Sequence, residues 1–303
     1  MLIPVILFVY NRPEHTKKTV EALSRNRGAS ETDLFIFSDG PKNEKAVSRV
    51  LQTREFIDSV GEKYNFKSTT VFKSEDNRGL ATSVILGVTK IISKYDKVIV
   101  LEDDLVTSCD FISYMNDALN YFEENDDIWS ISGYNPPIEI PEEYSAETYF
   151  SYRGCSWGWG TWKNKWELVD WEVKDYNDFR RNKVLRTKFN LGGRDLAFML
   201  DDQMSKKIDS WAIRWCYSQA KLGKYTVYPI ISRVENVGID GSGTHSGSSD
   251  HYKTSLNDEL GKCDFSNAEL NSVILNRFSQ HYMNDKQYYV EKYKRMIRDL
   301  LKR

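Results

Sequence analysis

Three consecutive acidic residues, Glu102, Asp103 and Asp104, follow the apolar residues 98–101 in this chain of 303 residues. Carboxylates at the end of a buried segment are costly unless a positive charge lies beside them. A divalent cation is the simplest candidate, because hard ions prefer carboxylate oxygens and would neutralise a departing diphosphate. A solvated acidic turn is the alternative interpretation of the same triplet.

The first part of the chain alternates strand-like and helix-like segments, which predicts where the triplet lies. We predict strands at residues 2–10, 34–38, 69–73 and 97–101, and helices at residues 13–24, 47–60 and 79–93. This order predicts an α/β fold with a mostly parallel, doubly wound, Rossmann-like sheet. Ligands of such sheets bind beyond the carboxyl ends of the strands. Arg12, Asp39, Arg78 and the acidic triplet each follow a predicted strand, so we treat them as one candidate site.

The remainder of the chain is less regular. We predict helices at residues 111–123 and 198–221, a strand at 225–232, a Gly/Ser-rich loop at 238–249 and a basic amphipathic helix at 286–303. The sequence therefore predicts one domain over residues 1–250, with a nucleotide-binding half at 1–106 and an irregular acceptor-side half at 107–250. Residues 251–303 are expected to form a C-terminal helical extension.

The order of several short motifs resembles the GT-A glycosyltransferases. The motifs are Asn-Arg-Pro at 11–13, Ser-Asp-Gly at 38–40, Asp-Asn-Arg-Gly-Leu at 76–80 and Leu-Glu-Asp-Asp at 101–104. Later matches are Gly-Cys-Ser-Trp-Gly-Trp-Gly-Thr-Trp at 154–162, Asp-Ser-Trp at 209–211 and Gly-Thr-His at 243–245. The resemblance covers about residues 2–250, and the Glu-Asp-Asp form is most similar to the N-acetylglucosaminyltransferase I type. It implies a GT-A fold and transfer of a sugar from a nucleotide-sugar.

The resemblance also implies roles for individual residues. Arg12 and Asp39 would contact the nucleoside, and Arg78 would lie near the nucleotide. Asp103 would bond the ribose or the donor sugar, and Asp104 would hold the metal, Mn²⁺ or Mg²⁺. The alternatives are surface charges for the two arginines and an Asx turn for Asp39.

The Gly/Trp-rich segment offers flat aromatic faces that suit a sugar. The resemblance places it under the donor sugar or beside the acceptor, so Trp157 and Trp159 are candidate binding residues. A tightly packed core turn is the alternative interpretation. His245, in a loop rich in glycine and serine, is predicted to lie near the metal or the diphosphate, and a solvent-exposed histidine is the alternative.

An inverting transfer needs a carboxylate that accepts the proton of the acceptor hydroxyl. The family places this acid beside a tryptophan as Asp-Asp-Trp, whereas this chain has Asp209, Ser210 and Trp211. Ser210 therefore stands where the base is expected, and serine is a poor base. We predict Asp209 as the base, with Asp201 and Asp202 as alternatives and a helix N-cap as the alternative role of Asp209.

Together these observations predict a metal-dependent glycosyltransferase that moves a sugar from a UDP-sugar to an acceptor hydroxyl with inversion. A carbohydrate or lipid-linked glycan is the expected acceptor, in bacterial surface glycan synthesis. A sugar nucleotidyltransferase would need a Gly-rich phosphate loop after the first strand, and residues 10–14 contain no glycine. A non-catalytic carbohydrate-binding protein would use the Trp-rich segment and would not need the acidic triplet.

Composition limits the partners and the compartment. The net charge of −2 gives no indication of a nucleic-acid partner. The four cysteines form no Cys-x-x-Cys pair, which favours reduced thiols in a cytoplasmic protein. The apolar start is too short to span a bilayer. The basic tail has two interpretations: peripheral contact with the anionic inner face of the membrane, or packing on the protein itself or on a partner.

Overall fold

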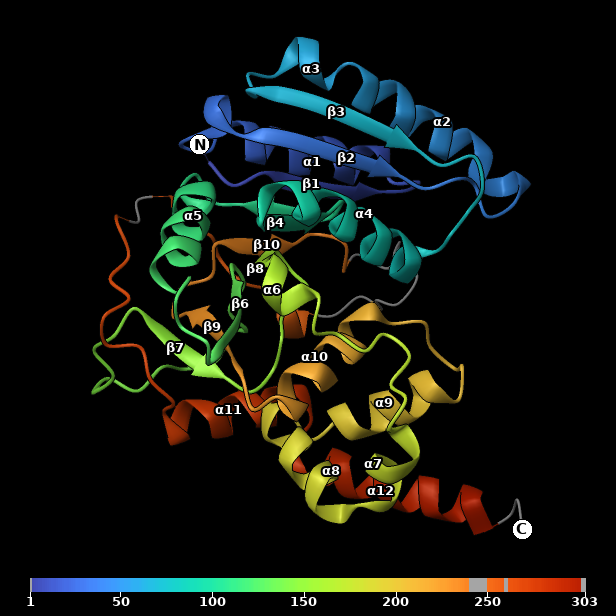
Figure 1. Cartoon of the computed structure of the whole chain (residues 1–303), viewed down its shortest axis with the longest axis vertical. Coiled ribbons are helices and arrows are strands. Elements are labelled where there is room, and N and C mark those ends of the chain that lie inside the picture. The colour runs from blue at the N-terminus through green and yellow to red at the C-terminus, as the bar shows by residue number, and fades with distance from the viewer. Residues whose placement is uncertain (1, 240–249, 259–260, 301–303) are drawn as a thin grey trace.

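The structure is a computed structural model, and it describes residues 2–239, 250–258 and 261–300. Within these ranges, an eight-stranded sheet with strand order β3-β2-β1-β4-β8-β6-β9-β7 runs through the molecule (Figure 1), and β5 and β10 form a small second sheet. The strands are β1 Val5–Val9, β2 Asp33–Ser38, β3 Ser68–Lys73, β4 Lys97–Glu102, β5 Leu105–Thr107, β6 Ile128–Ser132, β7 Thr148–Ser151, β8 Trp159–Trp162, β9 Tyr225–Pro229 and β10 Val234–Asn236.

The helices cover both faces of the sheet and build the lower end of the molecule (Figure 1). The α-helices are α1 Pro13–Ser24, α2 Glu44–Asp58, α3 Val60–Lys63, α4 Leu80–Tyr95, α5 Phe111–Tyr121, α6 Lys163–Trp166, α7 Tyr176–Arg181, α8 Lys183–Phe189, α9 Leu196–Met204, α10 Trp211–Lys221, α11 Ser272–Tyr282 and α12 Asp285–Leu300. Three short 3₁₀ turns, η1 Ala29–Glu31, η2 Asn190–Gly192 and η3 Asp250–Tyr252, complete the described elements.

The first four strands of the sheet are parallel, as the alternation of strands and helices predicted. β1 pairs in parallel with β2 and β4, and β2 pairs in parallel with β3. β8 then pairs antiparallel with both β4 and β6, β6 pairs in parallel with β9, and β7 closes the sheet antiparallel to β9. The prediction of a mostly parallel α/β sheet with an irregular second half is therefore confirmed.

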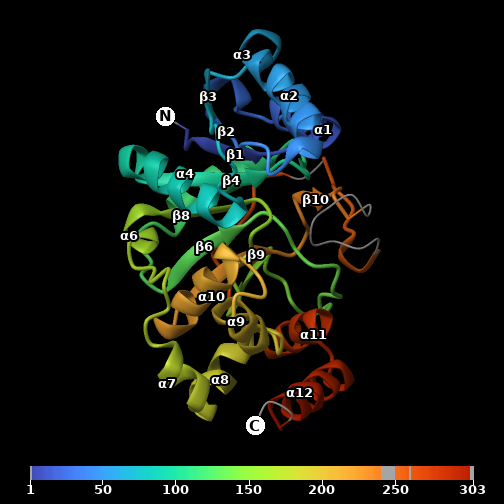
Figure 2. The ribbon, with the colours of Figure 1, turned by 90° about the vertical axis from the view of Figure 1, so that its right-hand side faces the viewer.

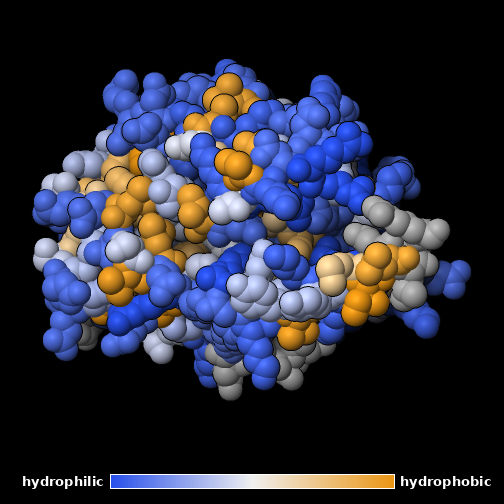
Figure 3. All heavy atoms as spheres, turned by 90° about the horizontal axis from the view of Figure 1, so that it is seen from below, coloured by the Kyte–Doolittle hydropathy of each residue, from blue (hydrophilic) through white to orange (hydrophobic). Residues whose placement is uncertain are grey.

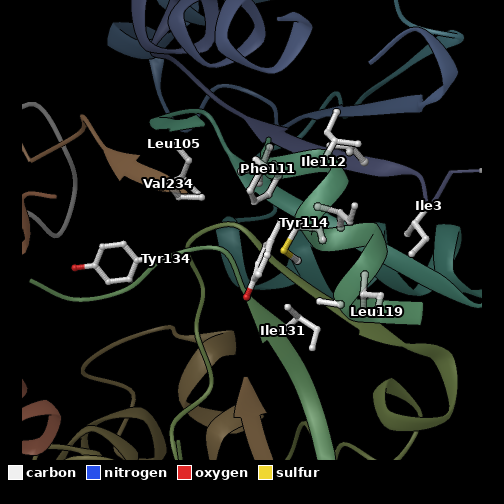
Figure 4. Close-up of a cluster of buried hydrophobic side chains, with 14 of the residues drawn as sticks. Ile3, Leu105, Phe111, Ile112, Tyr114, Leu119, Ile131, Tyr134 and Val234 are labelled. Carbon is white, nitrogen blue, oxygen red and sulfur yellow. The ribbon is translucent and has the colours of Figure 1, made fainter. Parts of the chain in front are cut away.

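The two faces of the sheet pack against different helices. Because successive side chains of a strand point to opposite faces, Leu7 of β1 enters one core and Phe8 the other. Figure 2 shows α1 and α2 on one side of the sheet and α4 and α6 on the other. On the first side, Phe111, Ile112 and Leu119 of α5 pack toward the sheet (Figure 4).

The other core contains an unusual concentration of tryptophan. Trp129, Trp159 and Trp215 are completely buried, and Trp166 and Trp211 pack against them. The ring of Trp159 stacks on that of Trp211 at 4.9 Å between centroids and on that of Trp166 at 5.9 Å. Five of the eight tryptophans of the chain therefore serve packing between the sheet, α6 and α10.

The structure confirms that residues 198–221 are mostly helical and divides them by a turn. Two helices occupy this region: α9 ends at Met204 and α10 begins at Trp211. The side chain of Ser210 accepts a hydrogen bond from the backbone N–H of Ile213 at 3.3 Å and so caps α10. The turn between the helices carries Asp209, which places that residue in a connection rather than inside a helix.

Several elements of the second half were not predicted from the sequence. The Gly/Trp-rich residues 149–171 contain β8 and α6 and most of β7, and the strand predicted at 225–232 ends at Pro229. The helix α11 lies within the predicted C-terminal helical extension, and its Ile274 and Phe278 are buried in the same core as Leu7. Among the described residues, no helix is both long and apolar enough to cross a bilayer.

Candidate active site

A cavity of about 1230 Å³ lies at the carboxyl ends of β1, β2 and β4. The strand side of the cavity is lined by Tyr10, Arg12, Asp39, Asn77, Glu102, Asp103 and Asp104. The opposite side comes from the segment before β8, from α9 and from the turn before α10, including Arg153, Trp157, Asp195, Gln203 and Asp209. The fold thus brings six of the predicted site residues to one cavity: Arg12, Asp39, Asp103, Asp104, Trp157 and Asp209.

Asp104 and Arg12 form an ion pair at the centre of the strand side. The Nη1 atom of Arg12 donates to Oδ2 of Asp104 at 2.6 Å, and its Nη2 atom donates to the carbonyl of Gly238 at 3.1 Å. The backbone N–H of Val237 donates to the carbonyl of Asp104 at 2.9 Å. A Cβ on Gly238 would collide with the Asp104 carboxylate and the Arg12 guanidinium, so glycine is required for this close approach. His245 lies outside the described residues.

The acidic triplet is electrostatically strained. Burial, together with the charges of Asp104 and Asp103, raises the pKa of Glu102 well above its usual range. Burial and the charge of Asp104 raise the pKa of Asp103 to about 7, although the backbone N–H of Tyr10 donates to its carboxylate at 3.1 Å. The Arg12 guanidinium favours the charged form of both acids but does not offset these effects.

The residues of the triplet fit a divalent cation of the kind that the resemblance implies. The donors at this edge of the sheet are carboxylate oxygens, which suit Mn²⁺ or Mg²⁺, and the raised pKa values of Glu102 and Asp103 indicate a shortage of positive charge. Over the ranges that the structure describes, no group of three His, Cys, Asp or Glu side chains forms a complete metal site.

Asp39 lies at the cavity, but its carboxylate is occupied by the protein itself. It accepts hydrogen bonds from the backbone N–H groups of Gly40, Arg78 and Gly79, each at 2.9 Å, and from the side-chain amide of Asn77 at 3.1 Å. These bonds fill the acceptor sites of a carboxylate. Asp39 therefore orders the loop after β3, so that Asn77 and Gly79 line the cavity.

Arg78 is placed differently from the prediction. Its side chain is exposed and does not line the cavity, although its backbone N–H binds Asp39. The neighbouring Asn77 lines the cavity instead. Within the Asp-Asn-Arg-Gly motif, Asn77 and Gly79 therefore line the cavity and the side chain of Arg78 does not. The carboxylate of Asp39 holds the loop in this arrangement by binding Asn77 and the backbone N–H groups of Arg78 and Gly79.

The two tryptophans proposed as sugar-binding residues separate into different environments. Trp157 is half-buried, lines the cavity and packs edge-on against Tyr134 at 4.7 Å and Tyr252 at 5.7 Å between ring centroids. Trp159 is completely buried in the tryptophan core and does not line the cavity. The proposal that Trp159 binds the donor is therefore wrong, because the side chain of Trp159 points from β8 into the core between the sheet, α6 and α10.

Alanine substitutions of these two residues should differ in how much they lower the stability of the protein. We expect Trp159→Ala to lower the free energy of unfolding by about 3–5 kcal/mol, because it leaves a large cavity in the core. Trp157→Ala removes a half-buried ring and should cost less stability while weakening the binding of a sugar. Chemical denaturation of the two variants checks the stability difference, and equal losses of stability would contradict the assignment.

Asp209, the acidic residue of the Asp-Ser-Trp motif at 209–211, lines the cavity. Its side chain is 65% exposed and lies 3.5 Å from the guanidinium of Arg214. Its Oδ2 atom would be 3.7 Å from a Cβ placed on Gly79, so Asp209 lies beside the loop after β3 at the edge of the cavity. The N-cap role considered for Asp209 belongs instead to Ser210.

The alternative bases lie elsewhere and have partners. Both carboxylate oxygens of Asp201 accept from Arg186 at 2.8 Å, and Asp201 also accepts from the hydroxyl of Tyr176. Asp202 is held in the same way by Arg295, at 2.6 and 3.0 Å, and by Lys207. Neither Asp201 nor Asp202 lines the cavity, so the geometry favours Asp209.

Sequence reasoning missed an ion pair on the far wall of the cavity. Arg153 donates through both terminal nitrogens to Asp195 at 2.9 Å, and both side chains are largely buried. Burial lowers the pKa of Arg153, but the Asp195 carboxylate more than offsets this and raises it overall. Arg153 also lies 3.8 Å from the ring centroid of Tyr282. The only indication in the sequence was that Asp195 directly precedes the apolar start of a helix. Its partner Arg153 lies 42 residues away, so the sequence did not reveal the pair.

Comparisons with known proteins agree with these features. The GNT-I family profile matches residues 1–190, which is more than half of the chain. The fold is similar to a crystal structure of TarS from S. aureus, with a TM-score of 0.42, 12% identity, and coverage of 77% of this chain and 36% of that chain. A structure of TarS residues 1–349 gives a TM-score of 0.41, 11% identity and coverage of 77% and 60%.

This chain therefore spans about a third of the first TarS chain and 60% of the second. A comparison with curated proteins found no match. The family match includes the ends of β1, β2 and β4 that line the cavity, from Arg12 to Asp104. The chain accordingly belongs to the GNT-I family and is a glycosyltransferase.

Proposed function

We propose that this glycosyltransferase moves a sugar from a UDP-sugar to an acceptor hydroxyl, with a divalent cation and with inversion at the anomeric carbon. The observation that carries the proposal is the arrangement of one cavity. It has Arg12 and the acidic triplet at the strand ends and a separate exposed carboxylate, Asp209, in the turn before α10. A donor with a charged leaving group suits the first side, and an acceptor that must lose a proton suits the second.

On the donor side, we propose that Arg12 and the loop ordered by Asp39 contact the nucleoside diphosphate. Asp103, already held by the N–H of Tyr10, would bond the ribose or the donor sugar. Asp104 would hold Mn²⁺ or Mg²⁺, with His245 as a second candidate ligand. When bound, the cation would neutralise the charge that develops on the departing UDP.

On the acceptor side, Asp209 would accept the proton of the acceptor hydroxyl as its oxygen bonds to the anomeric carbon. The bond from that carbon to the UDP oxygen breaks on the opposite face, and UDP leaves with the electron pair. The configuration at the anomeric carbon is therefore inverted. Arg214 would position the carboxylate of Asp209, because its guanidinium lies 3.5 Å away.

The acceptor is proposed to be a carbohydrate or a lipid-linked glycan. Trp157, Tyr134, Tyr252 and Tyr282 line this part of the cavity, and aromatic faces pack well against the apolar faces of sugar rings. We also propose that residues 1–106 form the nucleotide half, residues 107–250 the acceptor half and residues 251–303 a C-terminal extension. Synthesis of a bacterial surface glycan in the cytoplasm is the proposed setting.

Calorimetric titration of the whole protein with UDP and UTP, with and without Mn²⁺, tests the proposal. We expect UDP to bind, and its affinity to rise by at least about tenfold with Mn²⁺, because a cation held by Asp104 would offset the negative charge of the diphosphate. Preference for UTP with release of pyrophosphate would instead indicate a sugar nucleotidyltransferase. Absence of nucleotide binding in every condition would contradict both activities.

A further inference from the structure

The C-terminal helix α12 is attached to the protein through its polar side. Its half-buried residues, Tyr288, Glu291 and Arg295, are spaced three and four positions apart and so share one face. Arg295 binds Asp202 of α9, and Tyr288 stacks on Phe198 at 5.4 Å between ring centroids. An ion pair and aromatic contacts therefore hold α12, where a surface helix usually uses an apolar stripe.

The apolar stripe of α12 faces outward instead. It consists of Tyr289, Tyr293, Met296, Ile297 and Leu300, whose exposed fractions are 53%, 60%, 51%, 53% and 63%. Because an α-helix turns by about 100° per residue, these five positions fall within an arc of about 100°. A stripe of this kind, directed away from the body of the protein, indicates that an apolar phase or surface covers it in use.

Lysines border the stripe on both sides. Helical geometry places Lys292 next to one border of the stripe and Lys294 next to the other, and both side chains are exposed. Lysine side chains at such positions lay their methylene groups along apolar material and extend their ammonium groups to anionic ones. This combination is typical of helices that lie in the headgroup region of a bilayer.

A second basic element shares this end of the molecule. Residues 176–194, which include α7 and α8, contain six basic residues and one acidic residue. Arg180, Arg181, Lys183 and Lys188 are exposed, and Val184 between them is 76% exposed. Figures 1 and 2 both place α7, α8 and α12 at the lower end, and the view from below shows hydrophobic patches within a mostly hydrophilic surface (Figure 3).

We propose that this end, formed by α7, α8 and α12, docks on an anionic lipid surface with α12 lying in the plane of the headgroups. The net charge of the whole chain is only −2, so the basic character is local and complements anionic lipid. A second copy of the chain is a poorer occupant, because pairing two stripes would bring Lys292 and Lys294 close to the same lysines of the other copy.

Docking would orient the catalytic cavity. A smaller cavity of about 390 Å³ lies between α9 and α12 and shares Asp195, Met199 and Tyr282 with the large cavity. The acceptor side of the site therefore adjoins the docking end. This orientation rests on the proposed function: it would let an acceptor that is anchored in the membrane reach Asp209.

Sedimentation of the whole protein with lipid vesicles tests the docking without any need for transfer activity. We expect binding to vesicles of phosphatidylcholine mixed with phosphatidylglycerol and little binding to phosphatidylcholine alone. The double variant Tyr293→Ser/Ile297→Ser should reduce the partition coefficient at least about tenfold, because it removes apolar area that enters the bilayer. Lys292→Gln/Lys294→Gln should weaken binding and reduce its salt dependence.

The matched control is Val47→Ser/Leu51→Ser on α2 at the opposite end of the molecule (Figure 1), which changes two exposed apolar residues at the same spacing. It should bind as the unaltered protein does. Failure to bind anionic vesicles, or equal binding by the α12 variant and the control, would overturn the proposal. Light scattering that finds a lipid-free dimer broken by Tyr293→Ser/Ile297→Ser would overturn it too, in favour of a second copy.

Discussion

Replacing Asp104 with asparagine is expected to lower the rate of sugar transfer by about 10³-fold, because it removes the carboxylate that would hold the cation against the departing diphosphate. The substitution keeps the size of the side chain, so the packing of Gly238 against it should survive. Two effects on stability oppose each other: Arg12 loses its ion-pair partner, and the buried acidic triplet loses one repulsive charge. We therefore expect little change in the free energy of unfolding.

Steady-state kinetics at several Mn²⁺ concentrations, with calorimetry of UDP binding, measures this effect. The matched control is Asp76→Asn, which makes the same change on an exposed residue of the loop after β3 that does not line the cavity. That variant should keep the transfer rate and the metal dependence. If Asp104→Asn behaved like Asp76→Asn, Asp104 would not be the metal ligand.

Replacing Asp209 with asparagine is expected to reduce kcat by about 10²–10⁴-fold, which is the usual contribution of a general base. The donor KM should change less than kcat, because Asp209 belongs to the turn before α10 and not to the strand ends that carry Arg12 and Asp104. The chemical step is measured in single turnover, so that slow product release does not conceal it.

Two controls separate catalysis from structure in this region. Asp201→Asn loses a bidentate pair with Arg186 and should lower the free energy of unfolding by about 1–3 kcal/mol with little change in kcat. Ser210→Ala removes the N-cap of α10 and should cost about 1 kcal/mol. If Asp209→Asn transferred sugar at the normal rate while Asp201→Asn did not, the assignment of the base would be wrong.

The sequence by itself determined the first four strands and the edge of the sheet at which their polar ends meet. β1 to β4 are short apolar runs separated by helices, and β1, β2 and β4 end at Asn-Arg-Pro, Ser-Asp-Gly and Glu-Asp-Asp. Their positions along the chain and their parallel direction therefore follow from local pattern. Ligands of parallel α/β sheets bind beyond the carboxyl ends of the strands. The prediction of a parallel sheet therefore placed Arg12, Asp39, Asp103 and Asp104 at one site. These inferences depend on residues close in sequence and on one general property of α/β sheets.

The tertiary structure decided which side chains are available to a ligand. Trp157 and Trp159 are two residues apart in one Gly-rich run, yet one lines the cavity and the other lies in the core. The sequence favours Asp209 as the base but leaves Asp201 and Asp202 open, and only contacts with Arg186 and Arg295 show that these two are engaged elsewhere.

The same limit applies to the orientation of α12 and to the pairing of Arg153 with Asp195. The amphipathic pattern of α12 is evident in the sequence, but the pattern does not say which face meets the protein. Here the polar face is attached through Arg295 to α9, and the apolar face is exposed. Local periodicity specifies the elements, whereas burial and partner choice depend on contacts between residues far apart in the chain, which local sequence does not encode.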